Sequence, residues 1–152
     1  MDAMNPRTTP AILAELDQQL QSLKAELEAA GLRIDGHSGK SKEGPIWQFH
    51  FRKTWPVPPD EASVAILIWW AEWPEPEQVH ITRLADIYRQ GQLSHFKDKA
   101  ERSVSVESFI AEGVWPIVEA GIEEGRLLVE EASNKAFNPT SLPPLRGVRS
   151  AG

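Results

Sequence analysis

The apolar residues of the first 31 positions recur at the spacing of an α-helix. Thr9 stands before Pro10 as an N-cap residue does, and Gly31 provides a stop. Between them, five leucines follow one another at intervals of three and four residues, which places them on one narrow stripe. Such a stripe packs either on the sheet of its own domain or on a helix of a second chain, which leaves a homodimer open. The five are Leu13, Leu16, Leu20, Leu23 and Leu27.

The middle of the chain carries the period-two pattern of β-strands. In residues 46–55 aromatic side chains alternate with polar ones, so one face is buried and the other is wetter. Residues 64–73 are apolar at almost every position, as in a central strand covered on both sides. Residues 79–82 form a shorter alternating run. These runs predict a three-stranded antiparallel β-meander, preceded by a polar loop over 35–45.

A helical period returns after the strands. Leu84, Ile87 and Tyr88 share one helical face, which predicts a short helix over 84–91. Residues 92–104 fit neither the helical nor the strand period. The short helix is therefore followed by a stretch to which the pattern assigns no structure.

A longer acidic helix is predicted from Ser105, a suitable N-cap, to residue 124, with Gly125 as its stop. Pro116 kinks or splits this helix near Gly113. Seven glutamates and one arginine lie between 105 and 131, so this stretch alone carries the net charge of −6. Segregated negative charge disfavours nucleic acid and suits a protein partner with a basic surface.

From Ser133 onward the chain is rich in proline, glycine and serine, which predicts a disordered tail. We therefore expect one α+β domain over residues 1–132 and a flexible tail over 133–152. The domain is expected to consist of the N-terminal helix, the three-stranded antiparallel meander and C-terminal helices packed on the sheet.

The sequence contains no catalytic, metal-binding or cofactor-binding constellation that we recognise. Cysteine is absent, and the four histidines show neither the H-x3-H nor the H-E-x-x-H spacing of a zinc site. Ser38 lies beside His37 between glycines, but the composition of residues 36–44 favours a linker over a catalytic or phosphate-binding loop. Neighbouring carboxylates such as Glu123 and Glu124 do not face each other on a helix.

The first ten residues lack both a basic and an apolar region, so we expect no secretory signal. The longest apolar run, Val64 to Ala71, is far shorter than the roughly 20 residues of a bilayer span. Together with the absence of cysteine, this favours a cytoplasmic protein with no membrane anchor.

Tryptophan is the most unusual part of the composition. Six occur in 152 residues, and five of them fall between 47 and 73. Trp69 and Trp70 are neighbours on a strand and must point to opposite faces, so one of them needs cover from outside the sheet core. Trp55 and Trp73 lie beside prolines at strand ends, where an aromatic side chain is often half exposed.

These features favour a non-catalytic protein-interaction module, such as a small inhibitor, an immunity-type protein, an adaptor or a chaperone-like subunit. Its contact residues would be tryptophan anchors with glutamates that guide association. The predicted set is Trp55, Trp69, Trp70, Trp73, Glu119, Glu123 and Glu124.

Two other classes stay open. One is an enzyme or small-ligand binder with a pocket between sheet and helices that uses His50, His80 or Tyr88. The other is a single-stranded nucleic-acid binder in which sheet aromatics stack on bases. Arg52, Lys53 and Arg83 would serve the second class, against which the net charge argues.

Overall fold

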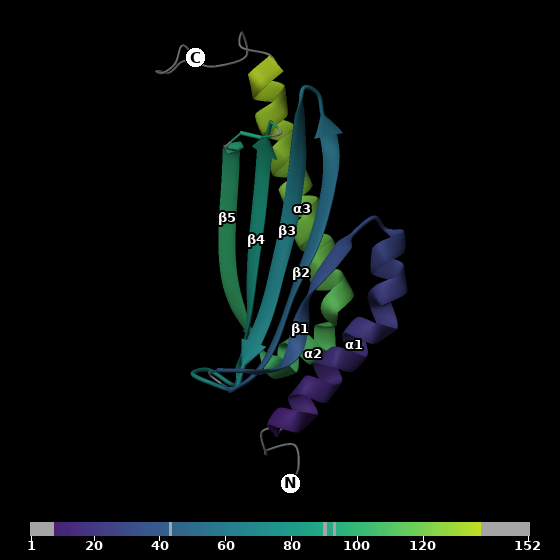
Figure 1. The fold of residues 1–152 in the computed structure, drawn as a ribbon, viewed down its shortest axis with the longest axis vertical. Helices are drawn as coiled ribbons and strands as arrows, with labels where there is room; N and C mark the ends of the chain where they lie inside the picture. Colours follow the sequence, from purple (N-terminus) through teal and green to yellow (C-terminus); the bar gives the residue numbers. More distant parts are fainter. Residues whose placement is uncertain (1–7, 43, 90, 93, 138–152) are drawn as a thin grey trace.

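The fold is α+β, with an N-terminal helix, an antiparallel sheet and two C-terminal helices (Figure 1). The computed structural model describes residues 8–42, 44–89, 91–92 and 94–137. The elements are α1 (Thr9–Ala29), β1 (Arg33–Ser41), β2 (Gly44–Val57), β3 (Asp60–Ala71), β4 (Gln78–Tyr88), β5 (Ser94–Ser105), α2 (Val106–Glu112) and α3 (Val114–Phe137). The strands pair in chain order, so the sheet is an antiparallel meander β1-β2-β3-β4-β5.

The sheet has five strands where the sequence predicted three. The predicted loop over 35–45 lies largely in β1, which pairs with β2 through nine residues. The predicted short helix over 84–91 is wrong, because Leu84 to Tyr88 continue β4. Residues 94–105, to which the pattern assigned no strand, form β5.

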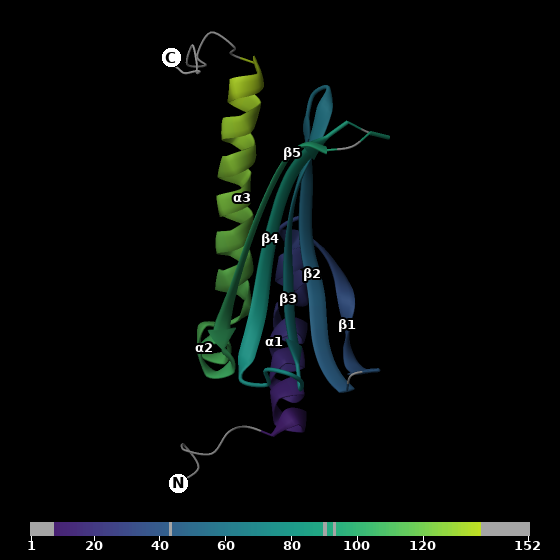
Figure 2. The ribbon, with the colours of Figure 1, turned by 90° about the vertical axis from the view of Figure 1, so that its left-hand side faces the viewer.

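Alternate residues of the central strand β3 form the floor of the core. These residues are Ala62, Val64, Ile66, Ile68 and Trp70, all fully or almost fully buried. Helices α1 and α3 lie over this face, so the molecule has a layer of helices on one side of the sheet (Figure 2). The other side chains of β3 point away from the helices.

The leucine stripe of α1 packs inside the chain. Leu16, Leu20 and Leu27 are buried in the core, and Leu13 and Leu23 pack partly buried against it. The helix begins one residue earlier than predicted, since Thr8 is the N-cap and accepts a hydrogen bond from the Ala11 amide at 3.3 Å. The stripe is therefore used within one domain and does not offer a free surface to a second chain.

The acidic C-terminal region is two helices that break where the proline pattern predicted. Ser105 caps α2, and Gly113 ends it with a φ of 94° that favours glycine. Pro116 then lies in the first turn of α3, where a proline is tolerated.

Gly125 does not end α3, contrary to the sequence prediction. A Cβ atom at Gly125 would lie 2.5 Å from a methyl group of Val64, and one at Gly121 would lie 2.5 Å from Ile66. These glycines let the helix approach β3 closely, and α3 continues through Phe137. Residues 133–137, predicted to be tail, are therefore helical, and the rest of the predicted tail, 138–152, lies outside the described residues.

Candidate functional site

The sheet face turned away from the helices is the best-defined candidate surface, and we call it the open face. The register places its side chains in rows that cross the sheet. One row is His37, Gln48, Trp69, His80 and Ser103; the next is Asp35, His50, Leu67, Thr82 and Glu101; the third is Arg33, Arg52, Ala65, Leu84 and Lys99. All three described helices pack against the other face (Figure 2).

Trp69 is held in a fixed orientation at the centre of the open face. Its ring stacks on His80, with ring centroids 4.2 Å apart and an interplanar angle of 25°. His80 is held in turn by Ser103, whose hydroxyl lies 2.8 Å from Nδ1, and by Glu75, whose carboxylate lies 3.4 Å from Nε2. The indole is half-buried by these neighbours and keeps one side toward the open face.

Serine, histidine and glutamate are also the residue types of a catalytic triad. Here Ser103 lies on the edge strand β5 and His80 carries the Trp69 ring against it. Neither residue lines the grooves of about 380, 440 and 610 Å³ that are described below. The contacts of His80 with Trp69, Ser103 and Glu75 hold the indole in its orientation. Sequence reasoning missed this arrangement, because Ser103 is 23 residues from His80 and only the β4–β5 register brings the two together.

Trp69 lies between Gln48 and His80 across the strands and next to Leu67 in the adjacent row, and charged residues lie along both edges of the face. Leu67 and Leu84 are half-buried on β3 and β4. At the edges, Arg33 pairs with Asp35 at 3.1 Å on β1, and Lys99 pairs with Glu101 at 3.4 Å on β5. The middle of the open face thus combines Leu67, Trp69 and Leu84 with polar side chains, and both edges are charged.

A polar cluster closes the end of the open face near the β2–β3 turn. Asp60 bonds Arg89 at 2.9 Å and His95 at 2.8 Å, and the pKa of Asp60 is lowered, chiefly by the Arg89 bond and then by His95. Tyr88 donates to Glu61 at 2.7 Å, which raises the pKa of the phenol. Through these bonds, Asp60 and Glu61 at the start of β3 connect to the end of β4 and the start of β5.

The nucleic-acid hypothesis groups Arg83 with Arg52 and Lys53 as a cation of an exposed sheet surface, but the Arg83 side chain lies on the face that the helices cover. It lies under the helices, is 8% exposed, and pairs with Glu124 of α3 and Asp98 of β5. It borders a groove of about 380 Å³ between α3 and the β4–β5 edge. Two carboxylates already oppose its charge, so Arg83 joins the helix to the sheet.

The predicted contact tryptophans occupy different places. Trp70 is fully buried and donates to the Pro76 carbonyl at 2.6 Å, so it cannot be an anchor. Trp55 is half-buried in a groove of about 440 Å³ between the end of β2 and α3. Trp73 is 68% exposed in the β3–β4 connection. Of the two neighbours on β3, Trp69 is the one that reaches the open face.

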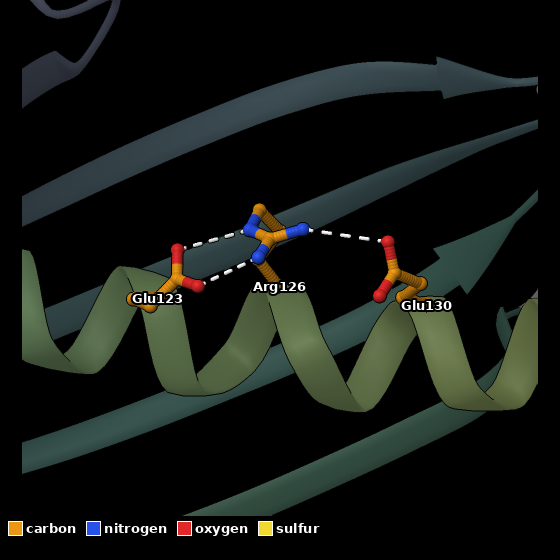
Figure 3. A network of polar contacts seen from close by, with 3 residues as sticks. All are labelled: Glu123, Arg126 and Glu130. Atoms are coloured by element: carbon orange, nitrogen blue, oxygen red, sulfur yellow. Dashed lines mark hydrogen bonds and ion pairs between the residues drawn. The ribbon is translucent and has the colours of Figure 1, made fainter.

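The predicted glutamates lie on α3, on the opposite side of the sheet from Trp69. Glu119 is exposed, whereas Glu124 is the partner of Arg83. Glu123 lies 2.6 Å from Arg126, which also pairs with Glu130 at 3.5 Å (Figure 3). This pairing lowers the pKa of Glu123. A single flat partner cannot contact Trp69 and these glutamates together.

The residues of the two alternative functions are also separated. His50, His80 and Tyr88 lie on the open face and line none of the three grooves. The third groove, about 610 Å³ near the start of α1, is lined by Glu72, Glu77 and Glu107 among others. Among the cations named for nucleic-acid binding, Arg52 lies on the open face and Arg83 lies on the covered face. These two cations therefore do not share a basic surface.

Within the described ranges, no group of three or more His, Asp or Glu side chains could hold a metal ion. Over the same ranges, no helix has both the length and the hydrophobicity needed to cross a membrane. A scan against models of known protein families finds no match, and neither does a search of curated protein sequences.

Proposed function

We propose that this chain is a non-catalytic protein-interaction module that binds its partner through the open face. One observation carries the proposal: the central strand β3 presents Leu67 and Trp69 on the side that no described helix covers. A half-buried indole on a rigid strand loses little side-chain entropy on binding, and tryptophan is enriched among the residues that dominate binding energy.

The open face suits a protein better than a nucleic acid. Its cations and carboxylates are balanced, as the edge pairs Arg33–Asp35 and Lys99–Glu101 illustrate. Nucleic-acid surfaces need an excess of positive charge. Leu67, Trp69 and Leu84 lie on the two strands β3 and β4 and charged residues lie along the edges, and protein interfaces combine buried apolar residues with a polar rim.

The acidic helix is a separate feature. Glu123 and Glu124 have partners within the chain and lie on α3, on the side of the sheet opposite the open face, so the proposed interface does not include them. The interface is proposed to comprise Trp69 at its centre, with Leu67, Leu84, His50 and His80 around it.

The test compares Trp69→Lys with Trp73→Lys. Tagged wild-type and variant chains are used to isolate complexes from native lysate, and any protein recovered, including untagged copies of this chain, is purified and its binding remeasured. Trp69→Lys should abolish the complex, whereas Trp73→Lys, at a more exposed indole outside the paired strands, should leave it intact. Equal binding by the two variants, or no complex with the wild-type chain, would exclude the proposal.

A further inference from the structure

The pattern of charges on the open face points to a particular partner, and the inference rests on the proposed function because it concerns the same surface. We propose that the open face binds a second copy of this chain. The two sheets would stack face to face, about 10 Å apart as in a β-sandwich. The twofold axis would cross β3 between Ala65 and Leu67, at right angles to the strands.

The strand register shows which residues would face each other across this axis. The axis exchanges the row that contains Leu67 with the row that contains Ala65, and each strand then faces the same strand of the second copy. The interface is isologous, as in most homodimers. Each residue of one row therefore faces its neighbour two positions along the same strand.

The charges of both edges become complementary under this operation. Asp35 of one copy faces Arg33 of the other on β1, and Glu101 faces Lys99 on β5. The symmetry repeats each of these contacts, which gives opposite charges at four places along the edges.

The other in-plane twofold, parallel to the strands, is disfavoured. It would lay β1 of one copy over β5 of the other at the same level. Asp35 would then face Glu101, and Arg33 would face Lys99. Like charges across an interface cost free energy and exclude that pairing, so the charge pattern selects one axis.

The sizes of the central side chains also match. On β3 and β4 a larger side chain meets a smaller one, since Leu67 faces Ala65, Trp69 faces Ser63 and Leu84 faces Thr82. On β2, His50 faces Arg52. The alternation on β3 and β4 is what two stacked sheets need for interdigitation. Ala65 and Ser63 are the small members of two of these contacts and project little above the sheet, being 7% and 6% exposed.

The available area is that of a stable dimer. Five strands at about 4.8 Å spacing, paired over some ten residues of about 3.4 Å each, give a face of about 800 Å². Two such faces give roughly 1,600 Å², the usual size of a specific interface. The charges on the open face also balance, so the −6 chain carries its acidic excess elsewhere, and stacking these faces holds the acidic stretches of the two copies apart.

The first experiment measures the mass of the purified chain by sedimentation equilibrium over a concentration series. The wild-type chain should reach twice its 17.0 kDa. Leu67→Arg places a cation beside the axis and should raise the dissociation constant at least about a hundredfold. Leu127→Arg is the matched control, because Leu127 is half exposed on α3, and it should leave the mass unchanged.

The second experiment uses a charge exchange on β5. Lys99→Glu places two carboxylates opposite each other at two symmetric contacts and should weaken the dimer about tenfold. Adding Glu101→Lys restores opposite charges and should return the dissociation constant to within about threefold of wild type. Circular dichroism of each variant checks that the sheet is intact.

The outcomes separate the two proposals. A wild-type chain that stays monomeric, a dimer that survives Leu67→Arg, or a double exchange that fails to rescue Lys99→Glu would each overturn the self-association. If the chain alone is monomeric but a complex from lysate still requires Trp69, the proposed function stands and only the identity of the partner is wrong.

Discussion

The guanidinium of Arg83 on β4 pairs with the carboxylate of Glu124 on α3, across the boundary between sheet and helices. Arg83 is buried, and its Nε has no hydrogen-bond partner among the described residues. A buried guanidinium needs an opposite charge nearby, because it has lost its hydration. The Glu124 carboxylate supplies one to Arg83, and the pair thereby fixes α3 against β4.

Glu124→Gln should destabilise the fold, because it removes one of the two carboxylates that compensate Arg83. We expect a loss of about 1 kcal/mol, reduced from the value for a fully buried pair because the Glu124 side chain is 65% exposed. Urea unfolding measures it. Glu119→Gln, an exposed change on the same helix, should stay within about 0.5 kcal/mol of wild type. Equal effects of the two variants would show that Arg83 does not depend on Glu124.

Gly125→Ala should lower stability, although alanine is the better helix former. The added methyl group would collide with Val64 at 2.5 Å, and overpacking typically costs about 1–3 kcal/mol against a gain of about 1 kcal/mol in helix propensity. We expect a net loss of up to about 2 kcal/mol in urea unfolding. A double-mutant cycle with Val64→Ala should show favourable coupling; additive changes would mean that α3 shifts away without contact.

Asp60 should stabilise the fold above acidic pH. Its folded pKa lies below the ordinary value of 3.8, so its contribution is present above about pH 4 and is lost as the pH falls through the folded pKa. Asp60→Asn should therefore be less stable than wild type at about pH 5, and the difference should shrink toward pH 2. Thermal unfolding across this range measures it. A difference that is constant with pH would exclude ionisation of Asp60 as the cause.

The single tyrosine of the chain permits a direct titration. Because Tyr88 donates to Glu61, its folded pKa is raised above 10, and the stabilisation is present below pH 10 and lost as the pH rises through the folded pKa. The ultraviolet absorbance of tyrosinate should therefore show a midpoint above 10. Glu61→Gln should lower that midpoint, and Asp86→Asn, which removes a weaker influence, should lower it less. An unchanged midpoint in Glu61→Gln would contradict the assignment.

The first helix could be predicted because its leucines, Leu13 to Leu27, repeat over about four turns and pack within the chain. The end of β4 could not, because Leu84 and Tyr88 are on the open face while Ile87 is on the covered face, and apolar residues on both faces imitate a helical stripe. The edge strands β1 and β5 carry few apolar residues and owe their conformation to pairing with β2 and β4.

For the candidate site, the period of two was sufficient to place Trp69 and Trp70 on opposite faces. It could not say which face the helices would cover, because that depends on contacts such as those of Gly121 and Gly125 with β3. The role of Arg83 carried no sequence signal, since its two partners lie on different elements far along the chain.

The chain-ordered pairing of the sheet has a consequence for synthesis on the ribosome. Each hairpin can close as soon as its second strand has emerged, since no strand waits for a distant one. Helix α3 follows all five strands in the chain, so the side of β3 that carries Val64, Ile66 and Ile68 is not covered by α3 until that helix has been synthesised. During that interval the nascent sheet exposes an apolar face to solvent. A chaperone that binds this face would protect the chain from aggregation.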